Sequence, residues 1–231
     1  MVVEIQNVLN ASLAIVSVVT AFFAIVVLAH LSKSRRAELL KRPAIIAFSS
    51  LSLAYVLFAV GNIWYYFDQI NAGNADLFWV TGSVLMLVGF MAFAWHLYNE
   101  RSSSRKAGFI TLLVTAVVVL AIYMTISNVS SIGNEPNQFQ LFLDYFYPIS
   151  GGLIILFAGF VFFFSEKIPF INTAMYLFAT ANMVSFLGDF LGLYLPEGTY
   201  GIFGASIDGL YLAQYVISFF AFAVLNDALK K

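Results

Sequence analysis

The sequence predicts an all-α integral membrane protein, a seven-transmembrane-helix bundle with its N-terminus outside the cell and its C-terminus in the cytoplasm. Composition carries the first part of this prediction, because 61% of the 231 residues are hydrophobic and only 10% are charged. A soluble domain has about 45–50% apolar and about 25% charged residues. The apolar residues also form runs of about 20 residues, the length that a membrane-crossing helix needs. We expect residues 1–231 to form a single membrane domain.

Seven apolar segments, separated by polar stretches, are the expected membrane helices. They cover about residues 8–31, 44–67, 77–98, 107–127, 146–165, 168–195 and 201–225. The first run has no positive charge before it and is followed at once by Lys33, which is not the pattern of a cleaved signal peptide. We therefore expect it to stay in the mature chain as a helix.

Proline, basic and turn residues delimit the other segments. The second begins after Pro43 and the sixth at Pro169, because proline suits the first turn of a helix, where its missing N–H leaves no bond unmade. A basic turn separates the third segment from the fourth. Turn residues then continue from 127 to 145, and Pro148 lies near the start of the fifth segment. Pro196 follows the sixth, and the seventh comes next.

Basic residues predict the orientation of the helices. Short cytoplasmic loops collect Lys and Arg, and here all 11 basic residues follow the first, third, fifth or seventh segment. They are Lys33, Arg35, Arg36, Lys41, Arg42, Arg101, Arg105, Lys106, Lys167, Lys230 and Lys231. One helix more or fewer would place basic loops on both faces, so this separation supports an odd count. We expect a multi-pass protein of the plasma membrane, with these loops available to a protein partner in the cytoplasm.

Two aspartates inside the predicted helices mark a candidate site. Asp189 and Asp208 flank the same short outer turn. A carboxylate at the bilayer centre costs about 2.5–3.5 kcal/mol, so both are expected to face the bundle interior or water. If the two carboxylates approach closely, they would share a proton or a cation. In the alternative interpretation, each lies in the wet outer boundary and accepts a hydrogen bond from a tyrosine or a helix terminus.

Other polar residues extend this candidate site along helix faces. Positions i, i+3 and i+7 share one face of a helix, and the sixth and seventh segments each carry such a polar stripe. The candidate ligand- or ion-binding residues are Asp189, Asp208, Asn182, Ser185, Tyr211, Gln214, Tyr215 and Asn62. They predict an outward-facing acidic and aromatic pocket for a small ligand.

The absence of cysteine and the small number of histidines exclude several kinds of functional site. The chain has no cysteine, which excludes disulfides and thiolate metal sites, and its two histidines are too few for a three-histidine zinc site. No complete catalytic set stands out, and we assign no catalytic residue and no metal. The composition also leaves no room for a soluble nucleic-acid-binding domain, so we expect no nucleic-acid partner.

Seven helices with the N-terminus outside resemble the microbial rhodopsins. That resemblance implies retinal held as a Schiff base on a lysine of the last helix. All six lysines lie in predicted loops or in the tail, and the segment 201–225 has none. A covalently bound retinal is therefore excluded on chemical grounds, and no other cofactor is assigned.

Four short motifs are similar to parts of the lysoplasmalogenase-like membrane family. They are Arg42-Pro43, Gly188-Asp189, His96-Leu97-Tyr98 and Tyr211-Leu212-Ala213-Gln214. The similarity implies an intramembrane lipid-modifying hydrolase. The chain departs from that family at Gly61-Asn62, where the family has Gly-Asp, and it is one predicted helix short.

Three functions remain open from the sequence. The favoured one is a non-enzymatic seven-helix module, sensor-like or a subunit of a membrane complex, because the loops are short and no catalytic set is complete. A secondary transporter or proton-coupled permease would use Asp189 and Asp208. A lipid-modifying hydrolase would use the same two carboxylates to activate water or hold a metal ion.

Overall fold

The computed structural model describes residues 2–33, 42–68, 73–99, 138–164, 172–192 and 201–230, together with scattered positions between 115 and 127. Every described residue except Asp68 is helical. The long helices are α1 (Val2–Lys33), α3 (Arg42–Phe67), α4 (Gly73–Asn99), α6 (Gln138–Phe164), α7 (Asn172–Gly192) and α8 (Gly201–Lys230). The positions described between 115 and 127 belong to a seventh helix, so the predicted all-helical class is confirmed.

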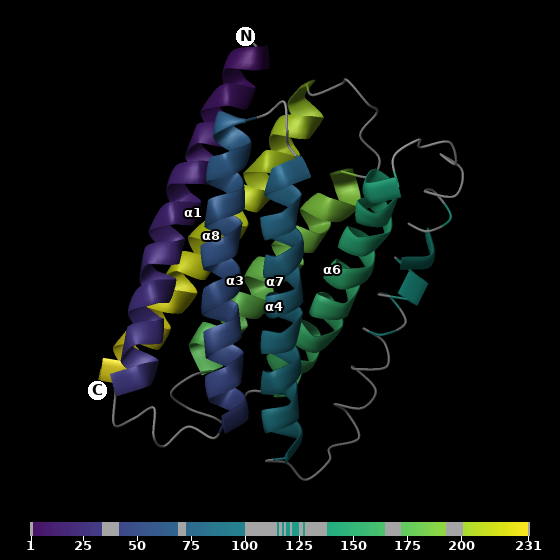
Figure 1. Cartoon of the computed structure of the whole chain (residues 1–231). Helices are drawn as coiled ribbons and strands as arrows, with labels where there is room; N and C mark the ends of the chain where they lie inside the picture. The colour runs from purple at the N-terminus through teal and green to yellow at the C-terminus, as the bar shows by residue number, and fades with distance from the viewer. Residues whose placement is uncertain are drawn as a thin grey trace.

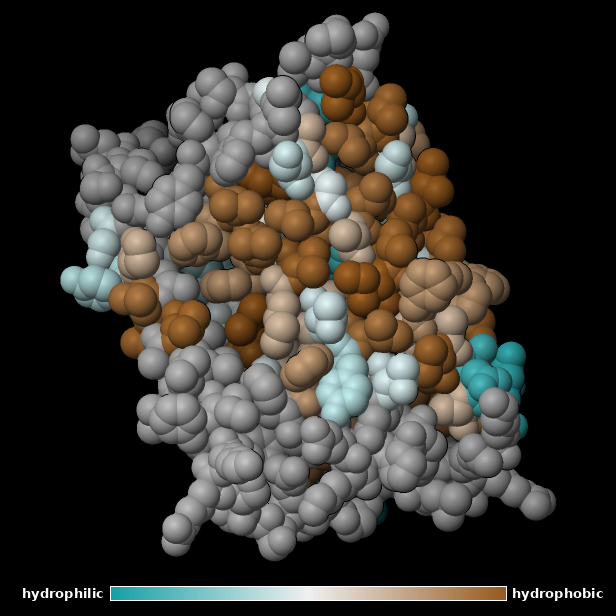
Figure 2. Space-filling view, turned by 180° about the vertical axis from the view of Figure 1, so that it is seen from behind, coloured by the Kyte–Doolittle hydropathy of each residue, from teal (hydrophilic) through white to brown (hydrophobic). Residues whose placement is uncertain are grey.

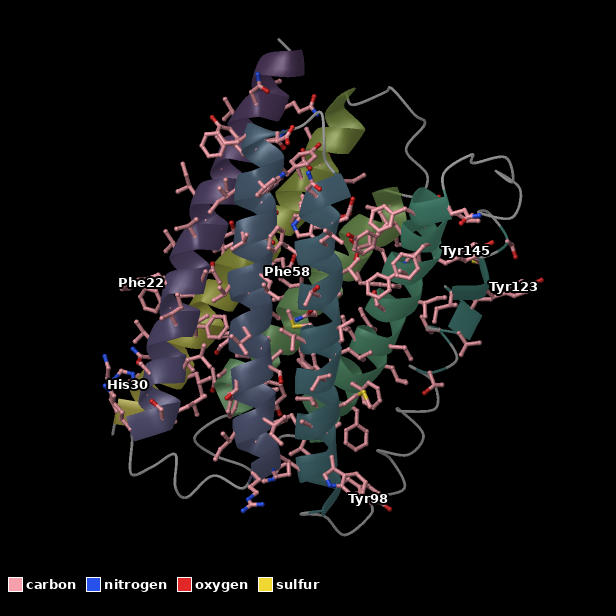
Figure 3. The ribbon with its side chains drawn as sticks, in the orientation of Figure 1. Phe22, His30, Phe58, Tyr98, Tyr123 and Tyr145 are labelled. Atoms are coloured by element: carbon pink, nitrogen blue, oxygen red, sulfur yellow. The ribbon has the colours of Figure 1, made fainter. Side chains whose placement is uncertain are left out.

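Six of the described helices are long and apolar enough to cross a bilayer, with spans of 20 to 29 residues. Their outer faces are largely apolar, as Figure 2 shows for the side of the bundle turned away from the viewer in Figure 1. Phe22, for example, lies on the outer side of α1 (Figure 3), and 62% of its surface is exposed. A surface of this kind is suited to lipid. The chain is therefore an integral multi-pass membrane protein.

Consecutive described helices run in opposite directions along the bundle, except that α4 and α6 run in the same direction. In Figure 1, α1 descends from the N-terminus at the top, α3 rises and α4 descends. α6 also begins at the top, so α4 ends and α6 begins at opposite ends of the bundle. α7 then rises and α8 descends, which leaves the two termini at opposite ends. The predicted fourth segment, 107–127, lies mostly outside the described residues.

The six helices form a closed ring in which each packs against two neighbours. Their order around the ring is α1, α3, α4, α6, α7, α8 and back to α1. The half of the interior nearer the C-terminus is filled by completely buried side chains, which include Phe48, Tyr55, Phe93, Phe178 and Phe222. We call this filled half, nearer the C-terminus, the solid half of the ring. The cavity described below lies in the other half.

Glycines allow α3 and α4 to approach closely. A Cβ atom on Gly89 of α4 would lie 3.1 Å from the carbonyl oxygen of Ala47 and 2.9 Å from Cγ of Leu51. A Cβ atom on Gly82 would lie 2.5 Å from the ring of Phe58. Small residues at helix interfaces have this effect in membranes, where packing drives association.

The start of α6 differs from the prediction. The sequence places the fifth segment at 146–165 with Pro148 near its beginning, but α6 already begins at Gln138 and Pro148 lies inside it. Membrane helices tolerate an internal proline because neighbouring side chains and helices accommodate the altered backbone bonding. Beside the proline, the Ser150 hydroxyl donates to the Tyr147 carbonyl oxygen at 3.1 Å. The turn residues before Pro148 therefore do not all lie in a loop.

Candidate ligand-binding cavity

All six long helices line one cavity of about 560 Å³ at the end of the bundle where α1 begins. This volume is typical of pockets for small organic molecules, about 300–1,000 Å³. Polar lining residues come from every helix: Asn10 on α1, Asn62 on α3, Asp76 on α4, Asp144 and Tyr147 on α6, Asp189 on α7, and Asp208, Tyr211 and Tyr215 on α8. His30 and Tyr98 mark the opposite end of the bundle (Figure 3).

The cavity has a strongly acidic lining. Asp76, Asp144, Asp189 and Asp208 lie on four different helices, and none of the described lining residues is Lys, Arg or His. An ionised carboxylate at membrane depth needs a partner of opposite charge or a hydrogen-bond donor. Hydrogen bonds from tyrosines meet part of this need for Asp76 and Asp189.

Two of the carboxylates accept hydrogen bonds from tyrosines on neighbouring helices. The Tyr211 hydroxyl of α8 donates to Oδ1 of Asp189 on α7 at 2.8 Å. The Tyr147 hydroxyl of α6 donates to Oδ1 of Asp76 on α4 at 2.6 Å. Such bonds to a charged acceptor are short and roughly twice as strong as neutral ones. Each pair therefore ties two adjacent helices together and fixes a carboxylate at the cavity wall.

An amide network crosses the ring one helical turn deeper along α8. The indole Nε1 of Trp79 donates to Oδ1 of Asn62 at 3.2 Å. The Nδ2 of Asn62 then donates to the Tyr215 hydroxyl at 2.8 Å. Because α3 and α8 are not neighbours in the ring, the bond between Asn62 and Tyr215 spans the interior.

This network yields a prediction for Asn62→Leu. The substitution keeps a side chain of similar size but removes the acceptor of Trp79 and the donor to Tyr215, and leaving a buried polar group unpaired costs about 1–3 kcal/mol. We expect thermal unfolding in detergent, monitored by tryptophan fluorescence, to have a lower midpoint than in the wild-type chain. Asn74→Leu, at an exposed position of α4, is the control, and an equal loss in both variants would contradict the role of the network.

An aromatic layer lies between the cavity lining and the solid half of the ring: the ring of Tyr55 packs against the lining residues Phe58 and Tyr215, with centroids 5.8 and 6.2 Å apart. The hydroxyl of Tyr55 is hydrogen-bonded to Oγ of Ser218, which in turn donates to the Gln214 carbonyl oxygen at 2.8 Å. The ring of Tyr55 lies 5.3 Å from that of Phe222, and Phe178 lies 4.7 Å from Phe222. All three rings are completely buried. We call Tyr55, Phe178 and Phe222 the cavity floor.

The structure brings together seven of the eight candidate residues predicted from the sequence. Those that line the cavity are Asp189, Asp208, Ser185, Tyr211, Gln214, Tyr215 and Asn62. Asn182 does not line it, because its side chain is buried and its Nδ2 donates to the Phe178 carbonyl oxygen at 2.8 Å. Asp189 and Asp208 face the same cavity, and Tyr211 lies one turn from Asp208 and binds Asp189. The binding role of these residues stays a prediction.

Sequence reasoning did not single out Asp76, Asp144, Tyr147 and Asn10, which also line the cavity. The first three were expected in outer turns or at the membrane boundary, because the third and fifth segments were predicted to begin at 77 and 146. α4 and α6 begin at Gly73 and Gln138 instead, so these residues lie on helices. The signal that could have found them is the i, i+3 spacing of Asp144 and Tyr147, which places both on one helix face.

The aspartates do not converge on a single point. Among the described residues, no group of three or more His, Cys, Asp or Glu side chains is arranged to hold a metal ion. The four carboxylates are instead distributed around the cavity wall. This arrangement can surround a molecule larger than an ion.

Comparison with known proteins identified no relative of the chain. No protein-family model, no curated protein and no solved structure matches the chain. The cavity residues themselves therefore carry the functional argument.

Proposed function

We propose that the chain is a non-enzymatic seven-helix membrane module that binds a small ligand in this cavity, as a sensor-like protein or as a subunit of a membrane complex. One observation carries the proposal: a cavity of about 560 Å³ that all six long helices line. A ligand held there contacts side chains of every helix. Its binding can therefore influence the arrangement of the whole ring.

The charge distribution supports an outward-facing cavity in the plasma membrane. Lys33, Arg42 and Lys230 lie at helix ends remote from the cavity, and basic residues collect on the cytoplasmic side. The N-terminus would then be outside and the C-terminus in the cytoplasm, with seven crossings. The basic cytoplasmic ends would be the surface for a protein partner to which the module transmits its state.

The cavity floor favours ligand binding over transport. A permease that moved its substrate across the membrane would have to separate Tyr55, Phe178 and Phe222, which pack edge-to-face or tilted against one another. Aromatic pairs of this kind contribute about 0.5–1.5 kcal/mol each beyond the area they bury. A closed floor of this kind is suited to a binding site that opens on one side only.

A cavity-filling substitution tests the proposal without changing charge. Ser83 lines the cavity from α4, and Ser83→Phe would occupy part of its volume. We expect that at least one solute from a panel of small cations, anions and neutral polar molecules raises the unfolding midpoint of the wild-type chain in nanodiscs. Ser83→Phe should abolish that rise.

Thr81→Phe is the matched control, because Thr81 is exposed on the same helix and a phenylalanine there faces lipid. This variant should keep the ligand-induced rise. If no panel solute stabilises the wild-type chain, or if Ser83→Phe responds as well as the wild type, the proposed function is wrong.

A further inference from the structure

The first ten residues of α6 form one wall of the cavity. The lining residues that α6 contributes are Leu143, Asp144, Tyr147 and Pro148. The residues that it contributes to the hydrophobic core cluster all lie further along the helix and are Ile154, Ala158 and Val161. The helix is therefore anchored in the solid half of the ring by its second part, while its first part borders the cavity. We call residues 138–147 the outer segment of α6.

A short stretch between these two parts has the composition of a helix hinge. Pro148 has no N–H to donate to the carbonyl oxygen four residues earlier. The Ser150 hydroxyl donates to the Tyr147 carbonyl oxygen at 3.1 Å, and serine bonds of this kind often bend a helix. Gly151 and Gly152 follow, and each glycine disfavours helix by about 1 kcal/mol relative to alanine. Sharp helix kinks occur at proline and at glycine and serine pairs, so we call the stretch from the proline to the second glycine the hinge.

Stacked rings hold the outer segment together as a unit. The rings of Phe139 and Phe142 are stacked with centroids 6.4 Å apart, and those of Phe142 and Phe146 are stacked at 5.4 Å. Side chains three or four residues apart lie next to each other on a helix, and such pairs stabilise it by about 0.2–0.5 kcal/mol each. The outer segment can therefore stay helical when the hinge bends.

A hydrogen bond beside the hinge ties the outer segment to α4. The Tyr147 hydroxyl donates to Oδ1 of Asp76 at 2.6 Å. Tyr147 directly precedes Pro148, so this bond fixes the direction in which the outer segment leaves the hinge. Both residues line the cavity. Breaking the bond releases the cavity wall from α4 without disturbing the core residues of α6.

We propose that the outer segment of α6 is a gate of the cavity, which swings about the hinge and away from α4 when the bond between Tyr147 and Asp76 breaks. The motion widens the cavity between α4 and α6 and leaves the solid half of the ring unchanged. The role of the gate in admitting a ligand rests on the proposed function. From the hinge to Gln138 the segment is about 15 Å long, so a change of about 20° in the kink moves its end by about 5 Å.

Distances between paired spin labels measure this motion. The chain has no cysteine of its own, so cysteines introduced at exposed positions are labelled without removing any other residue. The outer pair is Leu77→Cys on α4 with Gln138→Cys on α6. The inner pair, on the same two helices, is Met91→Cys with Phe162→Cys. Double electron–electron resonance would be recorded on the full chain in nanodiscs without added solute.

Tyr147→Phe removes the bond to Asp76 and keeps the aromatic ring. We expect the mean distance of the outer pair to increase by about 5 Å and that of the inner pair to stay unchanged. Tyr145→Phe makes the same chemical change on the side of α6 turned away from α4 (Figure 3), and it should change neither distance. An unchanged outer pair in Tyr147→Phe, or an equal increase in both pairs, would overturn the gate.

Pro148→Ala tests the hinge. The alanine restores the missing backbone donor, so adding it to Tyr147→Phe should suppress most of the increase in the outer distance. If the full increase persists, the helix does not bend at the hinge and the proposal is wrong. The comparison of the two label pairs in Tyr147→Phe leaves the proline in place, so it decides the proposal even if Pro148→Ala does not fold.

The label distances separate failure of this inference from failure of the proposed function, because they are measured without a ligand. If the outer pair responds to Tyr147→Phe as expected but no panel solute stabilises the wild-type chain, the gate stands and the ligand-binding function is wrong. If Ser83→Phe abolishes stabilisation by a solute but the outer pair does not respond to Tyr147→Phe, the gate is wrong and the ligand-binding function stands.

Discussion

Phe222→Ala should destabilise the chain by about 3–5 kcal/mol, the usual range for removing a buried aromatic ring. Phe222 is completely buried and packs against both Tyr55 and Phe178. Its removal leaves a void in the cavity floor that neighbouring side chains fill only in part. The free energy of unfolding of the purified chain would be measured in mild detergent, by thermal melting and by denaturant titration.

Phe220→Ala provides the matched control on the same helix. Phe220 is 54% exposed on the outer face of α8, so its truncation removes contacts with lipid or detergent rather than with the ring. The midpoint of this variant should stay close to that of the wild type. A loss as large as that of Phe222→Ala would mean that the floor is not the main packing element of the ring.

Gly89→Ala should lower stability by about 1–3 kcal/mol, the typical cost of overpacking. The added methyl group would meet the carbonyl oxygen of Ala47 at 3.1 Å, and a backbone atom in the neighbouring helix cannot rotate away. α3 and α4 would have to separate to accommodate it. Thermal unfolding in detergent and in nanodiscs would measure the effect.

Two other glycines make this prediction specific to backbone contact. Gly82→Ala brings a methyl group closer still, 2.5 Å from the ring of Phe58. That side chain borders the cavity, into which it can turn, so the loss should be smaller than for Gly89→Ala. Gly209→Ala meets nothing within 4 Å and should be neutral or stabilising, since alanine favours helix by about 1 kcal/mol over glycine. The opposite order would refute the backbone argument.

Composition and hydrophobic runs were enough to predict the helical membrane class and the six long helices that the structure describes. A lipid-facing helix must be apolar over about 20 residues, and this requirement leaves a strong signal in the sequence. The ends of helices leave a weaker signal in the sequence, because charged and turn residues are tolerated where a helix extends beyond the hydrocarbon core of the membrane. α6 illustrates this, since it continues upstream through Asp144 to Gln138.

The sequence singled out cavity-lining residues on three helices, α3, α7 and α8, and on none of the others. Asp189 and Asp208 stood out because a carboxylate among apolar residues is costly in a membrane. Asn10 and Tyr147 are less unusual by residue type, and only the rotation of α1 and α6 brings them to the same cavity. Helix rotation depends on packing between segments that are distant in sequence. The hydrogen bond between Tyr147 and Asp76, 71 positions apart, is an example of what one sequence does not specify.

The division of the ring into a solid half and a polar half also sets where the molecule can deform. Interlocked aromatic rings such as Phe178 and Phe222 hold the helices at fixed spacing near the C-terminus. Toward the other end, the bonds from Tyr147 and Tyr211 are single contacts between neighbouring helices. Regions with few buried apolar contacts open at lower free energy than the core. We therefore expect the helices to separate more easily at the cavity end of the bundle than at the end near the C-terminus.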